Sequence, residues 1–372
     1  MTNGPRLPQK LQRILAIDGG GIRGIIAIEV LVHLEAEISR VLGRPDVKLA
    51  DHFHLVAGTS AGAIISTAIA LGIPMSEIRD FVIANTKSMF RPSGWTRRLR
   101  YLYEKLQLEQ NLKDWFGPDT TLRSDKLQTL LLLVMRNAST DSPWLVSNNP
   151  QAPFNRGDLD DCNLDLKLWQ LARASAAAPG YFEPEVVTLG RHNPYMYVYV
   201  DGALTGFNNP AFKAFLYVTT APYGLNWPVG EDRLLVLSLG TGAARQLKPA
   251  IDPMRMRLWN IPLEASRALI FASEREQDLL CRTFGRCLMG KPIDLEVGDM
   301  RVGRTAVEPK LFTYFRINTM LTDAGLTELG CAHINPRHVE QLDAIHYVEE
   351  LRQVGHALAQ SAVTAELITN LL

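Results

Sequence analysis

The first part of the chain alternates short apolar runs with longer segments of helical periodicity. Residues 11–17 alternate in a pattern that predicts a strand, and Asp-Gly-Gly-Gly follows it as a predicted loop. Residues 25–42 carry apolar side chains at helical spacing and end before Gly43. The next run, 54–57, predicts a second strand, and 61–71 predicts a second helix. Such strand–helix repeats favour right-handed crossovers and a parallel sheet that helices cover on both faces.

The same alternation continues to about residue 245. Three further apolar runs predict strands, at 130–135, 195–200 and 234–239. A helical pattern at 165–178 ends at a Pro-Gly pair, which predicts a helix end.

Beyond residue 250 long helical patterns dominate. They cover 261–280 and 339–372, with a short predicted strand at 312–317 between them. We therefore expect an α/β domain over 12–245 and a mostly helical C-terminal extension, 246–372, packed on it.

The apolar run from Leu55 to Ile73 contains no charged residue and has a second interpretation as a membrane-spanning helix. Its 19 residues approach the ~20 that such a helix needs, and Gly58-x-x-x-Gly62 resembles a helix-dimerisation motif. Serine, threonine and glycine recur in the run, however, and make its beginning too polar for a membrane span. A short buried strand, a turn and a buried helix fit the pattern better.

The composition is that of an ordinary globular protein. Of 372 residues 47% are apolar, and 39 basic residues balance 39 acidic ones, so no overall field would draw the chain to a DNA or RNA duplex. Residues 1–10 lack the apolar core of a secretion signal, and we expect a cytoplasmic protein. The cysteines have no metal-ligand spacing, which predicts free buried thiols; no metal or cofactor is expected. They are Cys162, Cys281, Cys287 and Cys331.

Residues 56–62, Val-Ala-Gly-Thr-Ser-Ala-Gly, hold the first candidate for chemistry. Gly58-x-Ser60-x-Gly62 is the pattern of a nucleophile elbow, a sharp strand-to-helix turn that exposes a serine hydroxyl and has no room for flanking side chains. The pattern also arises by chance. Ser60 therefore needs partners elsewhere in the chain: a base for its proton and N–H donors for an oxyanion.

A glycine loop between the first predicted strand and helix is the candidate for those donors. Gly19, Gly21 and Gly24 also satisfy the dinucleotide-binding pattern G-x-G-x-x-G. That alternative needs an acidic residue at the end of the second strand, where the chain has Gly-Thr-Ser at 58–60. In the other interpretation the loop directs N–H groups at a tetrahedral oxyanion, and Arg23 buttresses the loop. The candidate donors are the N–H groups of Gly20, Gly21 and Ala61.

A serine nucleophile needs a base, for which the chain offers histidines and an aspartate. The late histidines satisfy a Ser–acid–His order, but His338, His346 and His356 lie in predicted helices beside polar residues, as surface histidines do. Asp201 ends an apolar strand and precedes Gly202-Ala203, which places its carboxylate at the carboxyl edge of a parallel sheet. Asp201 is the better candidate, although aspartate at a strand end is also common in turns.

Together these segments resemble the signatures of patatin-like phospholipases. The matching segments are Asp18 to Gly24, Gly58 to Gly62, Ala174 to Phe182, Asp201 to Ala203, Asn208 to Pro210 and Ser238 to Gly242. The resemblance covers about residues 12–245; many members have glycine where Ala63 and Ala203 stand. It implies a three-layer α/β/α sandwich around a mainly parallel sheet.

The resemblance further implies hydrolysis of lipid acyl esters by a Ser–Asp dyad without histidine. Ser60 would be the nucleophile, Asp201 the base and the glycine loop the oxyanion hole. The motif residues expected to support them are Gly19, Arg23, Gly24, Gly58, Gly62, Gly202 and Ala203. The partner would be a phospholipid surface, met peripherally at the inner membrane. The basic, aromatic segment 91–103 is our candidate for that contact, and a solvated loop or helix is its alternative.

The layout is also similar to bacterial patatin-like effectors of antiviral signalling systems, which implies a cyclic di- or trinucleotide activator. Arg267, Arg275, Arg282 and Arg286 are candidates for contact with its phosphates, with ordinary salt bridges as the alternative. A constitutive lipase or esterase, a Ser–His–Asp esterase and a non-catalytic binding protein stay open as alternatives, as does homo-oligomerisation.

Overall fold

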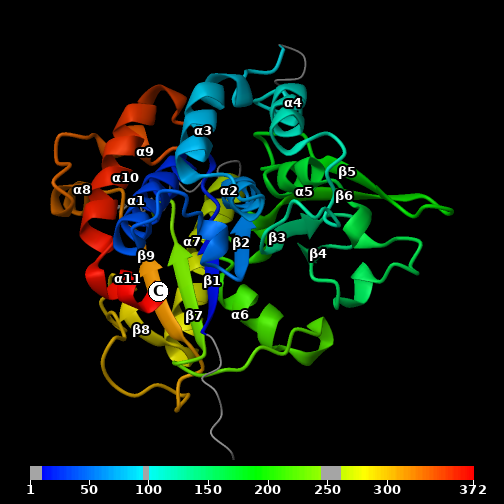
Figure 1. Ribbon diagram of the computed structural model, residues 1–372. Helices are drawn as coiled ribbons and strands as arrows, with labels where there is room; N and C mark the ends of the chain where they lie inside the picture. Colours follow the sequence, from blue (N-terminus) through cyan, green and yellow to red (C-terminus); the bar gives the residue numbers. More distant parts are fainter. Residues whose placement is uncertain (1–10, 95–99, 244–260) are drawn as a thin grey trace, which may run out of the picture.

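The computed structural model describes residues 11–94, 100–243 and 261–372, the last range with side chains from residue 268 onward. Within these ranges a nine-stranded sheet carries helices on both faces, which is the predicted three-layer α/β/α architecture (Figure 1). The strands are β1 (Gln12–Ile17), β2 (Leu55–Thr59), β3 (Leu130–Asn137), β4 (Ser142–Ser147), β5 (Glu185–Leu189), β6 (Tyr195–Asp201), β7 (Leu234–Leu239), β8 (Arg286–Met289) and β9 (Thr313–Ile317). The helices are α1 (Gly24–Leu42), α2 (Ala61–Ala70), α3 (Met75–Met89), α4 (Lys105–Phe116), α5 (Leu168–Ser175), α6 (Ala211–Thr219), α7 (Ile261–Phe284), α8 (Asp323–Glu328), α9 (Pro336–Val339), α10 (Val348–Ala362) and α11 (Ala365–Leu371).

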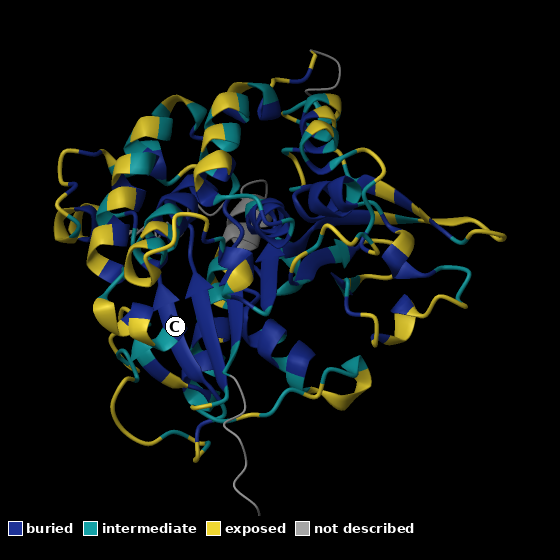
Figure 2. Ribbon diagram, in the orientation of Figure 1, coloured by how far each residue is buried: buried dark blue, intermediate teal, exposed yellow. Residues whose placement is uncertain are grey.

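Alternate residues of the central strands enter two separate cores. In β1, Leu15 and Ile17 pack with α1, α2 and α10, whereas Ile14 and Ala16 pack on the opposite face with α6 and α7. Both faces of these strands are therefore apolar, which explains why they read as continuous apolar runs in the sequence. Figure 2 shows the sheet buried in the centre and the exposed residues on the outer sides of the helices.

The parallel part of the sheet has the spatial order β3-β2-β1-β7-β9-β8. Strands β4, β5 and β6 are antiparallel additions. Strand β2 pairs with the first half of β3, up to Thr59 opposite Val134, and β6 pairs with its second half, with Asp201 opposite Met135. Because β4 occupies the other edge of β3, β2 and β6 share one edge and run toward each other. Their carboxyl ends meet.

This arrangement corrects one expectation. Asp201 was expected to end a strand of the parallel sheet, but β6 runs antiparallel to β3. Asp201 still lies at the carboxyl edge of the parallel strands, because β6 approaches that edge from outside the sheet. A strand's direction depends on its partners in space, so its own sequence does not reveal it.

The predicted helix at 165–178 is shorter in the structure. Helix α5 spans Leu168–Ser175, and a 3-10 turn, Asn163–Asp165, precedes it. The carbonyl of Ala177 accepts the N–H of Asp201 at 3.0 Å, so this carbonyl bonds to the end of β6 instead of continuing the helix.

The apolar run from Leu55 to Ile73 divides into β2 and α2, as predicted. No helix in the described ranges combines the length and the hydrophobicity that crossing a membrane requires. The four cysteines are free and buried, also as predicted.

The C-terminal part contributes strands as well as helices. Strand β9 pairs with β7 and β8 pairs with β9, so the sheet continues past residue 245. The domain boundary at that residue stays a prediction. Helix α10 packs closely on α1 at Gly355, where a Cβ atom would lie 2.9 Å from the Cβ of Glu29. Only glycine fits this crossing without a shift of one helix.

Candidate active site

Ser60 lies on the sharp turn between β2 and α2. Its backbone has φ 55° and ψ −123°, a combination that L-residues adopt rarely. A side chain at Gly58 would collide with the carbonyl of Gly62, and a side chain at Gly62 would collide with the carbonyl of Ile17. The two flanking glycines therefore allow the turn to approach both its own helix and β1.

The structure brings Ser60 and Asp201 into direct contact. The Ser60 hydroxyl donates to Asp201 Oδ2 at 2.7 Å, and the N–H of Ala203 donates to Asp201 Oδ1 at 2.8 Å. Both carboxylate oxygens are thus oriented, and the side chain has one defined position. Ser60 is 8% exposed and Asp201 is 3% exposed.

Burial raises the pKa of the Asp201 carboxyl from its ordinary 3.8 to about 6. The hydrogen bonds from Ala203 and Ser60 act in the opposite direction, because they stabilise the charged form. The carboxylate is therefore a stronger base than an exposed aspartate, yet it is mostly ionised at neutral pH.

The predicted oxyanion donors lie beside this pair. Gly20, Gly21 and Ala61 line the same cavity as Ser60, and among the described residues none of their N–H groups has a hydrogen-bond acceptor. Gly21 has φ +58°, and a side chain there would collide with the carbonyl of Leu342. These N–H groups are free to donate to a ligand, as an oxyanion hole requires.

Arg23 supports the glycine loop, as the sequence predicts. Its guanidinium donates to the carbonyl of Gly242 at 2.9 Å and, more weakly, to that of Gly20 at 3.4 Å. Two residues without a role in the prediction from sequence also hold the loop. The Thr241 hydroxyl donates to the carbonyl of Gly19 at 2.8 Å, and the Asn208 side chain donates to the same carbonyl at 3.3 Å and to Glu274.

A buried ion pair behind the loop was not predicted. Arg316 in β9 binds both carboxylate oxygens of Asp18, at 2.9 and 2.6 Å, and donates to Ser238 at 2.7 Å. Both charged side chains are almost fully buried. Asp18 directly precedes the glycine loop, so the pair ties that loop to β9 in the C-terminal part. The only signal in the sequence was a single arginine within a predicted apolar strand.

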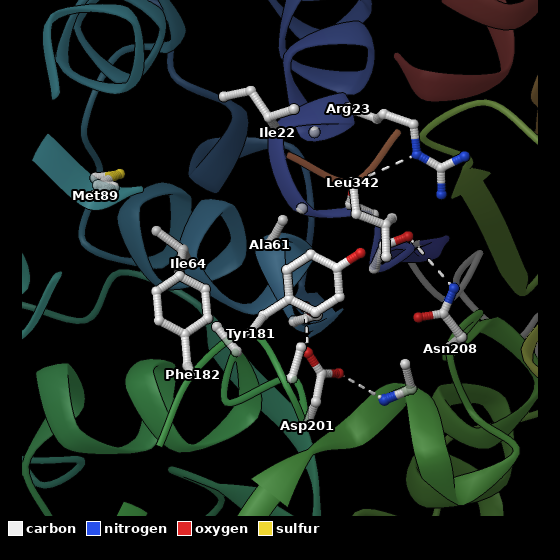
Figure 3. A pocket seen from close by; sticks show the side chains of 18 of the residues that line it. Ile22, Arg23, Ala61, Ile64, Met89, Tyr181, Phe182, Asp201, Asn208 and Leu342 are labelled. Atoms are coloured by element: carbon white, nitrogen blue, oxygen red, sulfur yellow. Dashed lines mark hydrogen bonds between the residues drawn. The ribbon is translucent and has the colours of Figure 1, made fainter. Parts of the chain in front are cut away.

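The cavity in front of Ser60 has a volume of about 230 Å³ and is almost entirely apolar. Figure 3 shows Tyr181, Phe182 and Ile64 around the space beside Asp201, with Met89 and Leu342 at its borders. Such a lining suits an acyl chain, and it accounts for the desolvation of Asp201.

The histidine alternative has no support at this site. All eight histidines lie within the described ranges, and none lines the cavity. His338 contacts Glu350 and stacks on Tyr347, His333 contacts Gln353, and His356 contacts Gln360. No cluster of three potential metal-ligating side chains occurs in the described part of the chain.

The candidate phosphate-binding arginines are engaged in ion pairs. Arg275 binds Asp294, Arg282 binds Asp278 and Arg286 lies 3.5 Å from Glu231. The side chain of Arg267 lies outside the described residues. Part of the candidate membrane segment, residues 95–99, also lies outside them.

A family model for patatin-like phospholipases matches residues 15–215, which is more than half of the chain. The chain therefore belongs to the patatin-like phospholipase family. Its similar proteins include Patatin-17 of Solanum cardiophyllum, which is 29% identical over 261 residues that cover 66% of this chain and 64% of that protein.

Two further relatives differ in what their names state. The probable inactive patatin-like protein 9 of Arabidopsis thaliana is 32% identical over 246 residues, covering 62% of this chain and 60% of that protein. A cGAMP-activated phospholipase of Escherichia coli strain TW11681 is 27% identical over 246 residues, covering 64% of this chain and 65% of that protein. The chain thus spans less than two thirds of the length of these relatives. Human GIVD cytosolic phospholipase A2 shares the fold, with a TM-score of 0.50 at 12% identity over 97% of this chain and 62% of that one.

Proposed function

We propose that the protein is a serine hydrolase that cleaves acyl esters of phospholipids, with a phospholipase A type of reaction. The observation that carries the proposal is the 2.7 Å contact between Ser60 Oγ and Asp201 Oδ2 beside an apolar cavity. Membership of the family alone does not imply activity, because one relative is named as probably inactive. The geometry of the pair is therefore the stronger support.

In the proposed reaction Ser60 Oγ attacks the ester carbonyl carbon while Asp201 Oδ2 takes the hydroxyl proton. The tetrahedral oxyanion receives hydrogen bonds from the N–H groups of Gly20, Gly21 and Ala61. Collapse of this intermediate breaks the bond to the lysolipid oxygen, which takes the proton from Asp201. Water then attacks the acyl carbon while Asp201 takes its proton. The bond from that carbon to Ser60 Oγ breaks, Oγ regains a proton from Asp201, and a fatty acid leaves.

The test is lipid product analysis by mass spectrometry after incubation with phospholipid vesicles. Wild type should release fatty acid and lysolipid, while Ser60→Ala and Asp201→Asn should show losses of about 10³-fold or more. A fluorophosphonate probe should label the wild type and not Ser60→Ala. Thr129→Val is the matched control, because it removes a buried hydroxyl that bonds the Phe53 carbonyl at the far end of β3. Near-native turnover by Asp201→Asn would contradict the dyad.

We further propose that the protein meets its substrate at a membrane surface near segment 91–103. Arg100 and Leu102 are exposed in the described part of this segment, and Leu106 is exposed just after it, in the first turn of α4. Tyr103, by contrast, packs on Phe90 and donates to Asp343, so its removal would also disturb packing. The double change Leu102→Ser/Leu106→Ser should reduce the rate on vesicles much more than the rate on a soluble ester. Equal losses on both substrates would exclude the region.

Control by a cyclic di- or trinucleotide, within an antiviral defence role, is a further proposal. Its support is the E. coli relative, whose name states activation by cGAMP. The ion pairs of Arg275, Arg282 and Arg286 offer no free cationic site among those three side chains. Rates on phospholipid with and without a panel of cyclic nucleotides test the idea. Unchanged rates would favour the alternative, a constitutive patatin-like lipase, for which Patatin-17 is the comparable relative.

A further inference from the structure

The end of α5 lies at the point where the carboxyl ends of β2 and β6 meet along β3. Pairing of β2 with β3 stops at Thr59 opposite Val134, and pairing of β6 begins one residue further, at Asp201 opposite Met135. The proposed nucleophile and base are thus the residues on either side of a gap in the sheet. Ser175 accepts a hydrogen bond from one side of that gap and Ala177 from the other, and the function proposed above gives neither residue a role.

Ser175 bridges the gap on the side of the nucleophile. The backbone N–H of Ser60 donates to Ser175 Oγ at 2.9 Å, and the Ser175 hydroxyl donates to the carbonyl of Val134 at 2.6 Å. A hydroxyl is suited to this position because it accepts and donates at the same time. Ser175 is fully buried, so water does not compete for either bond.

Ala177 makes the corresponding contact on the side of the base. Its carbonyl accepts the N–H of Asp201 at 3.0 Å. The next residue of that strand end, Gly202, packs so closely on the Val134 carbonyl that a side chain there would collide with it. Ser175 and Ala177 therefore accept the backbone N–H groups of both members of the proposed dyad, and Ser175 also bonds to Val134 of β3.

We propose that Ser175 is a positioning residue that, with the carbonyl of Ala177, sets the separation of Ser60 Oγ from Asp201. The inference rests on the proposed hydrolase function, but it makes a separate claim. Ser60 has a rarely populated backbone conformation, and its N–H would lose its partner if the Ser175 hydroxyl were absent. The turn would then relax, and the hydroxyl of Ser60 would move from its 2.7 Å contact with Asp201. Substrate binding in the apolar cavity would change little, because Ser175 does not line it.

The experiment compares Ser175→Ala, Ser175→Thr and the control Thr129→Val on a soluble p-nitrophenyl ester. Ser175→Ala should lower kcat by about 10- to 100-fold with KM within about twofold, since only the alignment of reacting atoms is lost. The loss of activity on acidification should also begin at a higher pH than in the wild type. The reason is that the Ser60 hydrogen bond holds the pKa of Asp201 down, and this bond would be lost. Ser175→Thr keeps the hydroxyl and should recover most of the rate. Thr129→Val loses a comparable buried hydroxyl and should keep the wild-type kcat and pH profile.

Two kinetic outcomes overturn the inference: a folded Ser175→Ala with wild-type kcat, or an equal loss of kcat in Thr129→Val. If Ser175→Ala does not fold, Ser175→Cys fills the same position with a sulfur that donates and accepts weakly, and the same loss of kcat is expected. A crystal structure of the Ser175 variant separates the inference from the proposed function, because it needs no turnover. An unchanged Ser60–Asp201 contact in the variant would refute the positioning role. If Ser60 is displaced in the variant but the wild type itself is inactive, only the hydrolase proposal is refuted.

Discussion

The buried carboxylate of Asp201 predicts that activity and the contribution of this group to stability change in opposite directions as pH rises from about 4 to 7. Burial raises the pKa of this carboxyl to about 6, and the hydroxyl of Ser60 is its hydrogen-bond donor. A base must be ionised to accept a proton. The value of kcat/KM should therefore be constant above about pH 7 and fall about tenfold for each pH unit below 6.

The same pKa fixes the size and sign of the effect on stability. The carboxyl has a raised pKa in the folded protein, so the folded state binds a proton more tightly than the unfolded state does. The contribution of Asp201 to stability is then lost as pH rises from about 4 to about 6. A shift from 3.8 to about 6 corresponds to roughly 3 kcal/mol of destabilisation at pH 7. Asp201→Asn removes the charge and should increase the free energy of unfolding at pH 7 by about 1–3 kcal/mol, while it abolishes hydrolysis.

Two measurements check this reasoning. The first is kcat/KM on a soluble ester from pH 4.5 to 8.5, and the second is urea unfolding of wild type and Asp201→Asn at pH 4 and pH 7. Glu274 needs a control, because burial raises its pKa to about 7 and it contacts Asn208 beside the glycine loop. Glu274→Gln should leave the activity limb near pH 6 in place. A rate that stays constant down to pH 4.5, or an asparagine variant no more stable than wild type at pH 7, would refute the argument.

Three structural predictions concern the supports of the site. Arg316→Met leaves the carboxylate of Asp18 buried without its partner, and urea unfolding should show a loss of about 3–5 kcal/mol; a loss below 1 kcal/mol would contradict it. Gly202→Ala drives a Cβ atom into the carbonyl of Val134, so fluorophosphonate labelling of Ser60 should slow by at least about tenfold in a folded variant. Gly355→Leu forces α10 away from α1 and should destabilise the protein by about 1–3 kcal/mol, whereas an unchanged melting temperature would show that the crossing is loose.

The parts of the site that local geometry creates could be predicted from the sequence. Ser60 was identifiable because its turn leaves no room for side chains at Gly58 and Gly62, and such a requirement is written in adjacent residues. The glycine loop was identifiable for the same reason. Gly21 needs a positive φ and a close approach to another backbone segment, and only glycine meets both conditions.

The parts that depend on contacts between distant segments could not be predicted. Ser175 lies 115 residues from Ser60 in the chain, and its role depends on the gap between β2 and β6. Arg316 lies 298 residues from Asp18, in a strand whose place in the sheet the sequence does not state. A serine or an arginine is compatible with many environments. The roles of Ser175 and Arg316 follow only from the residues that they contact in the folded protein.

The two proposed catalytic residues share a further property that connects their chemistry to the fold. Ser60 has a rare backbone conformation and Asp201 is a buried carboxylate, and each of these features is unfavourable by itself. They persist because contacts from β3 and from the end of α5 hold both backbones in place. Proton transfer needs the Ser60 hydroxyl in contact with a sufficiently basic carboxylate, and a relaxed turn or a solvated Asp201 would each reduce the reactivity of the pair. The sheet around Val134 therefore holds both residues in these unfavourable states. For this reason we expect substitutions at Ser175 to reduce the reaction rate more than they reduce the stability of the fold.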